Sequence, residues 1–241
     1  MRSPFSITPI GTLQSPFKEK FAVPRQPGLA PSALAHLKLH DDANQIEAVR
    51  GIEQYSHLWL LFIFDQNLEK GWRPTVRPPR LGGNERIGVF ASRATFRPNG
   101  IGMSAVELVD VSQDNGQVTL TLRGCDLVDQ TPIIDIKPYI PYSDSIADAQ
   151  GGFAQTKPTP MDVRFSDNAL QALSQSPYQA YHQRVISEVL AQDPRPAYKQ
   201  GKKDDKCYAV HLFDFNVRFY VQPTQILVVA VEAFVETPPH C

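Results

Sequence analysis

Two alternating runs on either side of an Asp-Asn-Gly turn constrain the fold of this chain more than any other feature. Apolar and polar residues alternate over Met103–Val111 and again over Gln117–Gly124, which is the period of a half-buried β-strand. Asp114-Asn115-Gly116 lies between the runs, and Asn-Gly is a preferred sequence for a tight hairpin turn. The pattern predicts an antiparallel hairpin and therefore a fold in which consecutive strands pair.

This hairpin decides how the glycine motif before it is interpreted. Gly100–Ala105 reads GIGMSA, which fits the pattern G-x-G-x-x-G/A of dinucleotide-binding folds. That fold needs a helix directly after the glycines, because the helix N-terminus binds the phosphate. A strand and a hairpin turn follow here instead. We therefore interpret the match as accidental and reject a Rossmann fold.

Further alternating segments extend the prediction to a mainly β domain over residues 1–150. Consecutive strands joined by turns predict an antiparallel β-sheet or β-barrel for this domain. The other expected elements are strands at Phe5–Leu13, His57–Phe64, Ile87–Arg93 and Pro132–Ile136, and a short helix at Asn44–Arg50.

The chain then changes composition. Ser143–Met161 is rich in Ala, Gly, Gln, Ser, Thr and Pro, as linkers are, so we place a domain boundary there. A small α+β domain is expected over residues 160–241. Its elements are a helix with Ser176 as N-cap and Pro177 at the first position, ending before Asp193, and two strands at Cys207–Tyr220 and Gln225–Phe234.

Composition and charge exclude several classes of protein. The 24 basic and 25 acidic side chains give a formal charge of −1, so a nucleic acid would need a local basic patch. Cys125, Cys207 and Cys241 have no C-x-x-C spacing and form no disulfide framework, which favours a reducing cytoplasm. The longest apolar run, Leu58–Phe64, is far shorter than the roughly 20 residues of a membrane helix. The N-terminus lacks the pattern of a secretion signal.

A local basic patch exists between Lys70 and Gly100. This segment contains seven basic residues and one acid, a balance of +6, and six of the seven are arginine. Arginine binds phosphate and carboxylate groups through two parallel hydrogen bonds. Prolines stiffen the segment, and Trp72 and Phe96 are suited to stacking on bases. A solvated basic face is the alternative, but these features favour contact with phosphate or nucleic acid.

Two other candidate sites carry less weight. His36 and His40 share a face if the segment is helical, but no third ligand is evident, so we expect a surface pair and predict no metal. Cys125 has no histidine partner that the sequence identifies, so we expect a small packed residue rather than a nucleophile.

Several long motifs resemble those of a known family. They are KEKFAVPRQPG (18–28), YSHLWLLFIF (55–64), KGWRPTVRPPRLGGN (70–84), GVFASRATFRPNGIGMS (88–104), CDLVDQTPIIDIKPY (125–139), DPRPAY (193–198) and DFNVRF (214–219). Together they extend over nearly the entire chain and resemble the TrmO/YaeB family. The resemblance implies a β-barrel methyltransferase that uses S-adenosylmethionine, forms homodimers and methylates threonylcarbamoyladenosine beside the tRNA anticodon, on the exocyclic nitrogen of the base.

The resemblance also implies where the methyl donor binds. A pocket for this molecule needs polar acceptors, backbone donors and an apolar slot. Arg93 is assigned to the donor's carboxylate or a nearby phosphate, and a structural ion pair with Asp126 or Asp129 is the alternative. By resemblance the pocket comprises Pro24, Arg25, Gln26, Asp65, Gln66, Arg93, Ile101, Met103, Asp126, Leu127, Val128 and Asp129.

The motif from Asp135 to Tyr139 is the predicted catalytic segment. Asp135 and Lys137 lie on the same side of a strand, where a carboxylate and an ammonium tune each other's pKa. We expect Asp135, Lys137 and Tyr139 to contact the modified base, with Asp135 or Tyr139 as proton acceptor. An Asp-Lys pair that only fixes the loop is the alternative.

A further group of residues is expected to bind tRNA. It comprises Arg73, Arg77, Arg80, Phe96, Arg97 and Asn99 in the first domain and Arg195 and Arg218 in the second, where Arg184, Lys199, Lys202 and Lys203 are additional basic candidates. The competing function from another class is a non-catalytic RNA-binding or regulatory barrel that keeps the basic loop alone. Binding of the methyl donor separates the two functions.

Three positions depart from the family pattern. Asp65 stands where the family commonly has histidine, so a catalytic role for that position is doubtful. Gly100 replaces a proline and Gln130 replaces a glycine, and both changes act mainly on backbone freedom.

Overall fold

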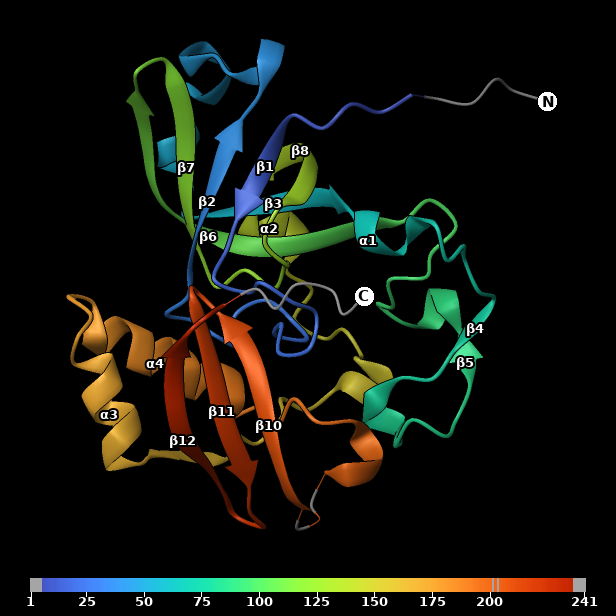
Figure 1. The fold of residues 1–241 in the computed structure, drawn as a ribbon. Coiled ribbons are helices and arrows are strands. Elements are labelled where there is room, and N and C mark those ends of the chain that lie inside the picture. The colour runs from blue at the N-terminus through green and yellow to red at the C-terminus, as the bar shows by residue number, and fades with distance from the viewer. Residues whose placement is uncertain (1–5, 201, 203, 236–241) are drawn as a thin grey trace.

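The computed structural model describes residues 6–200, 202 and 204–235, and within these ranges six antiparallel strands close into a barrel (Figure 1). The order around the barrel is β1-β2-β7-β6-β3-β8, and β8 pairs back with β1. The strands are β1 (Gly11–Gln14), β2 (Leu34–Leu39), β3 (His57–Ile63), β6 (Ile101–Asp114), β7 (Gln117–Arg123) and β8 (Thr131–Pro138). The predicted mainly β fold with an antiparallel barrel is confirmed.

The hairpin that dominates the sequence forms β6 and β7. Asp114 pairs with Gln117, and Asn115 and Gly116 in the turn have φ angles of 49° and 81°. Asn and Gly are the residues that adopt these left-handed angles most easily. β6 begins at Ile101, so a strand and not a helix follows the glycine motif. The rejection of a Rossmann fold is confirmed.

Alternation along the strands fills the barrel. Val118, Leu120 and Leu122 of β7 are buried at every second position, and each fully buried Leu or Val contributes roughly 1.5–3 kcal/mol of hydrophobic stabilisation. Cys125 belongs to the same buried cluster, and burial raises the pKa of its thiol. The interpretation of Cys125 as a small packed residue is confirmed.

Several predicted element boundaries in the first domain are wrong. The strand predicted at Phe5–Leu13 is β1, which starts at Gly11, and Phe5 lies outside the described residues. The strand predicted at Ile87–Arg93 ends at Gly88, because a 3-10 helix (Val89–Ala91) turns the chain. The helix predicted at Asn44–Arg50 is replaced by 3-10 helices at Asp41–Ala43, Ile46–Val49 and Ile52–Gln54.

The strand β2 is missing from the predicted elements. His36 lies on β2 and not on a helix, so the shared helical face of His36 and His40 does not exist. The sequence signal for β2 was the apolar residue at every second position, Ala35, Leu37 and Leu39. In the structure these three side chains are buried in the barrel.

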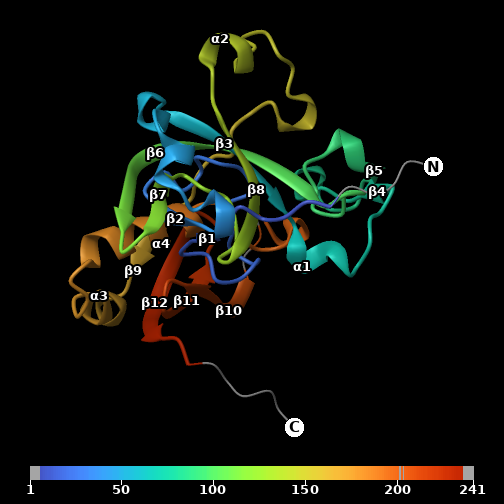
Figure 2. The same ribbon diagram turned by 90° about the horizontal axis from the view of Figure 1, so that it is seen from above.

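A second sheet lies below the barrel in Figure 1, with the order β10-β11-β12-β9. Helices pack against this sheet on one side, as Figures 1 and 2 show, so the domain is α+β. β9 pairs parallel to β12, and the other pairs are antiparallel. The elements are β9 (Asp162–Phe165), α3 (Asp167–Leu173), α4 (Gln179–Leu190), a 3-10 helix (Ala197–Lys199), β10 (Asp204–Leu212), β11 (Phe215–Val221) and β12 (Gln225–Ala233).

Two predictions for this domain need correction. The single strand predicted at Cys207–Tyr220 is β10 and β11, because Phe213 adopts a φ of 55° and the chain turns there. The helix predicted to start after Ser176 begins at Gln179, and the Ser176 hydroxyl accepts a hydrogen bond from the N–H of Tyr178 at 3.1 Å. α3 and β9 are absent from the prediction.

Two exposed segments lie outside the barrel and the second sheet. Residues 64–100 leave the barrel between β3 and β6 and form α1 (Asp65–Leu68), a ribbon of β4 (Thr75–Val76) and β5 (Ile87–Gly88), and a 3-10 helix (Pro79–Leu81). We call residues 70–100 the arginine-rich excursion, and it lies to the right of the barrel in Figure 1. In the chain, α2 (Pro141–Asp144) and a 3-10 helix (Gly152–Ala154) lie between β8 of the barrel and β9 of the second sheet.

The connection between β1 and β2, residues 16–33, packs on the second sheet and is called the strap. Phe17, Ala22, Ala30 and Ala33 are buried in the same cluster as the apolar side chains of α4, β10, β11 and β12. The strap lies within the predicted first domain, 1–150, but its apolar side chains complete the core of the second. The division into 1–150 and 160–241 stays a prediction.

No helix in the described part of the chain has both the length and the apolar composition needed to cross a bilayer.

Candidate active site

A cavity of about 780 Å³ lies where the strap, the end of β3, the start of β6 and the arginine-rich excursion meet. Its lining also includes residues that follow β7. Eleven of the twelve residues predicted to bind the methyl donor line it: Pro24, Arg25, Gln26, Asp65, Gln66, Arg93, Ile101, Met103, Asp126, Leu127 and Val128. Folding therefore brings together motifs that are up to a hundred residues apart in the chain.

Two phenylalanine rings form an apolar part of the wall. Phe62 and Phe64 line the cavity and contact each other edge to face, with ring centroids 5.1 Å apart. Gly102 pairs with Phe62 across β3 and β6, and a Cβ at this position would overlap the Phe62 ring. Glycine at residue 102 therefore lets β6 pass close to the rings.

Asp126 is a partly buried acid in the cavity wall. Its Oδ1 accepts a hydrogen bond from the hydroxyl of Ser104 at 2.6 Å, and Ser104 is buried. Burial raises the pKa of Asp126 to about 6, while the Ser104 hydrogen bond and the positive charge of Arg93 act in the opposite direction. At neutral pH the cavity thus contains a poorly solvated anion, which favours a cationic group beside it.

Asp129, the twelfth predicted residue, does not line the cavity. Its carboxylate accepts a hydrogen bond from the N–H of Ser15 at 2.8 Å and forms an ion pair with Lys18 at 2.9 Å. These contacts direct Asp129 toward the end of β1 and the start of the strap. Asp129 thus fixes the start of the strap on the barrel, and its role in donor binding stays a prediction.

Arg93 is held inside the site by an amide. Its guanidinium donates to Oε1 of Gln26 at 2.7 Å, and both residues line the cavity. Within the described residues Arg93 forms no ion pair with Asp126 or Asp129, so the alternative of a structural ion pair is contradicted. The charge of Arg93 does reach Asp126, since it lowers the pKa of that acid.

The arginine-rich excursion contributes Phe96 and Arg97 to the cavity. Arg97 donates to the carbonyls of Val89 and Ser92 at 3.2 and 2.8 Å, which ties the excursion together. The Arg73 guanidinium lies 4.9 Å from the centre of the Phe96 ring, a cation–π geometry. Arg93 and Arg97 line the cavity, whereas Arg73 does not.

Three other residues predicted to bind tRNA lie outside the cavity lining. Arg77 and Asn99 are exposed, and Arg80 donates to the carbonyl of Thr156 at 2.8 Å. The Arg80 contact joins the excursion to the segment between the two sheets. A role of these residues in tRNA binding stays a prediction.

None of the predicted catalytic residues lines the cavity. Asp135 and Lys137 form an ion pair at 3.1 Å, as the alternative interpretation expected, and the Tyr139 ring lies 5.5 Å from that of Trp59. Asp135 is opposite Leu61 in the β3–β8 ladder, and Leu61 lines the cavity. Asp135 therefore lies one strand from the rim, and its role toward the base stays a prediction.

Arg195 cannot contact tRNA, in contrast to the prediction. Its side chain is 1 % exposed and forms two hydrogen bonds of 2.8 Å with the carboxylate of Asp193. Arg218 is exposed and lies 3.6 Å from Glu232, so it remains accessible. Lys203 lies outside the described residues.

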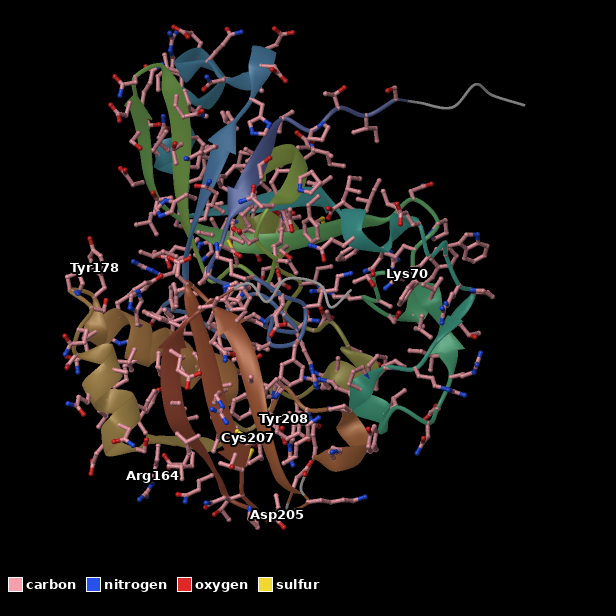
Figure 3. The ribbon with its side chains drawn as sticks, viewed as in Figure 1. Lys70, Arg164, Tyr178, Asp205, Cys207 and Tyr208 are labelled. Carbon is pink, nitrogen blue, oxygen red and sulfur yellow. The ribbon has the colours of Figure 1, made fainter. Side chains whose placement is uncertain are left out.

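Sequence reasoning missed several residues of the cavity. Lys20, Asn67, Lys70, Ser104 and Thr131 line it, and Figure 3 labels Lys70 close to α1. The Lys20 ammonium donates to the carbonyl of Gln66 and to Oδ1 of Asn67 at 3.1 and 2.9 Å. Burial and the neighbouring charge of Lys70 lower the pKa of Lys20. Lys20, Lys70 and Ser104 lie within the motifs that carry the family resemblance, and this position was the sequence signal that could have identified them as cavity residues.

The structure explains two of the departures from the family pattern. Gly100 has a φ of 61°, an angle that proline cannot adopt, so the turn before β6 differs from one built on proline. Gln130 has a φ of 64°, in the region that favours the glycine it replaces. Asp65 is the first residue of α1 and lines the cavity.

Within the residues that the structure describes, no group of three or more His, Cys, Asp or Glu side chains is arranged to hold a metal ion.

Comparisons with known proteins agree with the motifs. Residues 12–145 match the family described as the tRNA-methyltransferase O N-terminal domain, and residues 158–234 match the TrmO C-terminal domain. A tRNA (adenine(37)-N6)-methyltransferase of Escherichia coli K12 is 53 % identical over 95 % of this chain and 99 % of its own length. A putative S-adenosylmethionine-dependent methyltransferase, RcsF, of Pseudomonas aeruginosa is 48 % identical over 94 % of this chain and 97 % of its own. The crystal structure of TrmO from Pseudomonas aeruginosa superposes with a TM-score of 0.78 at 40 % identity, covering 96 % of this chain and 99 % of that one.

Proposed function

This chain belongs to the TrmO family, and we propose that it transfers a methyl group from S-adenosylmethionine to N6 of the adenosine beside the anticodon of tRNA. The observation that carries the proposal is the convergence of the family motifs on one cavity, which they line together with an acid and several cations. The acceptor we propose is threonylcarbamoyladenosine, bound as part of the anticodon arm by a cytoplasmic homodimer.

The cavity has the chemistry that the methyl donor requires. S-adenosylmethionine carries a sulfonium, an ammonium, a carboxylate, a ribose and an adenine. Asp126 supplies an anion for a cationic part, and Arg93 supplies a guanidinium for the carboxylate. The rings of Phe62 and Phe64 supply an apolar surface for the adenine, and Gln26 and Gln66 supply amide groups for its polar edge. The described residues therefore fit the donor.

The protein's main contribution to the reaction is positioning. When bound, the donor supplies an electrophilic methyl group whose transfer to N6 leaves a neutral thioether. Holding the base in line with that methyl group accounts for up to about 7–11 kcal/mol of the barrier. A general base that accepts the N6 proton adds a factor of about 10² to 10⁴, or roughly 3–5 kcal/mol.

The arginine-rich excursion is suited to bring the base to that place. Its basic side chains neutralise phosphates. The rings of Trp72 and Phe90 are 53 % and 75 % exposed, so they are available to stack on unpaired bases. Met103, 51 % exposed at the start of β6, adds an apolar contact between this surface and the cavity. A single-stranded loop fits such a surface better than a duplex does, because its bases are accessible.

Two measurements test the proposal. Isothermal titration with S-adenosylhomocysteine should show one binding event per chain, and purified protein with the methyl donor should convert threonylcarbamoyladenosine in tRNA to its N6-methyl form, detected by mass spectrometry of nucleosides. No heat with S-adenosylhomocysteine, together with retained tRNA binding, would favour the competing function, a non-catalytic RNA-binding barrel.

A further inference from the structure

We infer that Arg195 and Asp193 of the second domain are positioning residues for the methyl-donor cavity, and that they act by holding Arg25 in its wall. The inference rests on the proposed function, since it assigns the cavity to the methyl donor. It gives the second domain a task in donor binding that is separate from contact with tRNA.

The loop after α4 is fixed by the side chains of Asp193 and Arg195. Asp193 and Arg195 are both buried, and the Arg195 guanidinium forms hydrogen bonds of 2.8 Å to both carboxylate oxygens of Asp193. A third donor of the same guanidinium reaches the carbonyl of Lys202 at 3.0 Å. Because a bidentate pair fixes both side chains, the backbone between residues 193 and 195 has little freedom.

This loop contacts the wall of the cavity through Arg25. The carbonyl of Arg195 accepts a hydrogen bond from Nη2 of Arg25 at 3.3 Å, and Arg25 lines the cavity. Burial and the positive charge of Arg80 lower the pKa of Arg25, whereas the Asp193 carboxylate raises it. Asp193 therefore compensates Arg25 electrostatically and holds, through Arg195, the carbonyl to which Arg25 donates.

The strap contacts the second domain at several points along its length. Phe17 forms a bridge with Leu212, the carboxylate of Glu19 accepts a hydrogen bond from the N–H of His211 at 3.0 Å, and Phe21 stacks on Tyr208 at 6.2 Å. Figure 3 labels Tyr208 on β10. At the other end of the strap, the Glu188 carboxylate accepts hydrogen bonds from the N–H and hydroxyl of Ser32 at 2.8 and 2.6 Å.

Other contacts hold the strap on the barrel and on the arginine-rich excursion. The N–H of Gly28 donates to the carbonyl of Gly124 at 2.8 Å, and the carbonyl of Phe17 accepts from the N–H of Asp129 at 2.8 Å. Pro24, Arg25 and Gln26 lie between these contacts. Within this segment Arg25 is held from the second domain through the carbonyl of Arg195, and Gln26 is held from the excursion by Arg93.

The test is a double-mutant cycle read by binding. Asp193→Asn should weaken S-adenosylhomocysteine affinity by about tenfold in the otherwise native chain and by less than about twofold in a chain that already carries Arg25→Ala. Arg164→Gln, which removes an exposed ion pair with Asp162 in the same domain, is the matched control and should leave the affinity unchanged. Hydrogen exchange of the ligand-free protein should be faster in residues 20–28 of the Asp193→Asn protein and unchanged in the control.

Three results would overturn the inference. One is an equal loss of affinity from Asp193→Asn with and without Arg25→Ala, and another is an unchanged affinity. The third, absence of S-adenosylhomocysteine binding by the native protein, would reject the proposed function as well. Should Asp193→Asn fail to fold, Arg195→Lys replaces it in the same cycle, because lysine keeps a positive charge beside Asp193 but loses the two-point geometry.

Discussion

Replacing Asp126 with asparagine should make the protein more stable at neutral pH. Burial raises the pKa of Asp126 from an ordinary 3.8 to about 6, so the folded protein holds the carboxyl proton more tightly than the unfolded chain does. Between these two pH values the folded state binds more protons, and stability therefore falls as the pH rises. Below 3.8 both states are protonated and this penalty is absent.

The size of the effect follows from the two pKa values. The difference between 3.8 and about 6 corresponds to about 3 kcal/mol, which is the stability lost by the time the pH exceeds about 7. Asparagine does not ionise, has nearly the same shape, and its amide oxygen can still accept from the Ser104 hydroxyl. The Asp126→Asn protein should thus gain up to about 3 kcal/mol relative to the native protein between pH 4 and pH 7.5.

The assay is urea unfolding at both pH values, followed by tryptophan fluorescence. Trp59 lies on β3 of the barrel, so it reports the unfolding of the part that contains Asp126. In thermal unfolding the same difference amounts to roughly 6–12 °C for a chain of this size. Other carboxyl groups titrate in both proteins and cancel in the comparison.

A stability difference between the two proteins that does not change with pH would refute the reasoning, because the penalty must arise from ionisation. An asparagine variant that is less stable at pH 7.5 would refute it as well. Binding supplies the functional counterpart: we expect Asp126→Asn to bind S-adenosylmethionine more weakly, since the anion that stabilises the cationic donor is then absent.

Three further changes test other parts of the structure. Gln130→Gly should stabilise the protein by about 0.5–1 kcal/mol in chemical unfolding, because residue 130 has a φ of 64°, and a loss of stability would contradict this explanation. Gly102→Ala should cost about 1–3 kcal/mol and weaken S-adenosylhomocysteine binding, since the added Cβ overlaps the Phe62 ring; unchanged titration heats would show that the wall adapts. Asp135→Asn should slow methyl transfer to tRNA and leave S-adenosylhomocysteine affinity unchanged, because Asp135 lies outside the cavity lining, and an unchanged turnover number would remove Asp135 from catalysis.

Local sequence determined the elements whose conformation depends on neighbouring residues alone. Asn115 and Gly116 tolerate left-handed angles, so the β6–β7 hairpin follows from the turn and the alternation beside it. The same alternation predicted β3 and β8 approximately. It is also present in β2, although we considered a helix for the segment that contains His36 and His40. Motif resemblance added the residues that line the cavity, which come from distant parts of the chain and which only folding brings together.

Tertiary structure decided which of two similar side chains faces the cavity. Asp126 and Asp129 are three residues apart in one motif, yet Asp126 meets Ser104 of β6 and Asp129 meets Lys18 of the strap. Which carboxylate is desolvated depends on the strands that surround the turn, and these come from distant parts of the chain. Sequence gives the charge of each group, but the burial that shifts a pKa exists only after the barrel closes.

The same reason explains the wrong prediction for Arg195. In the sequence, Arg195 is one more basic residue near a loop, indistinguishable from an exposed cation. In the folded protein the Arg195 side chain is buried, and Asp193 compensates its charge. A buried ion pair depends on neighbours that are far away in the chain, so its burial could be learned only from the assembled structure.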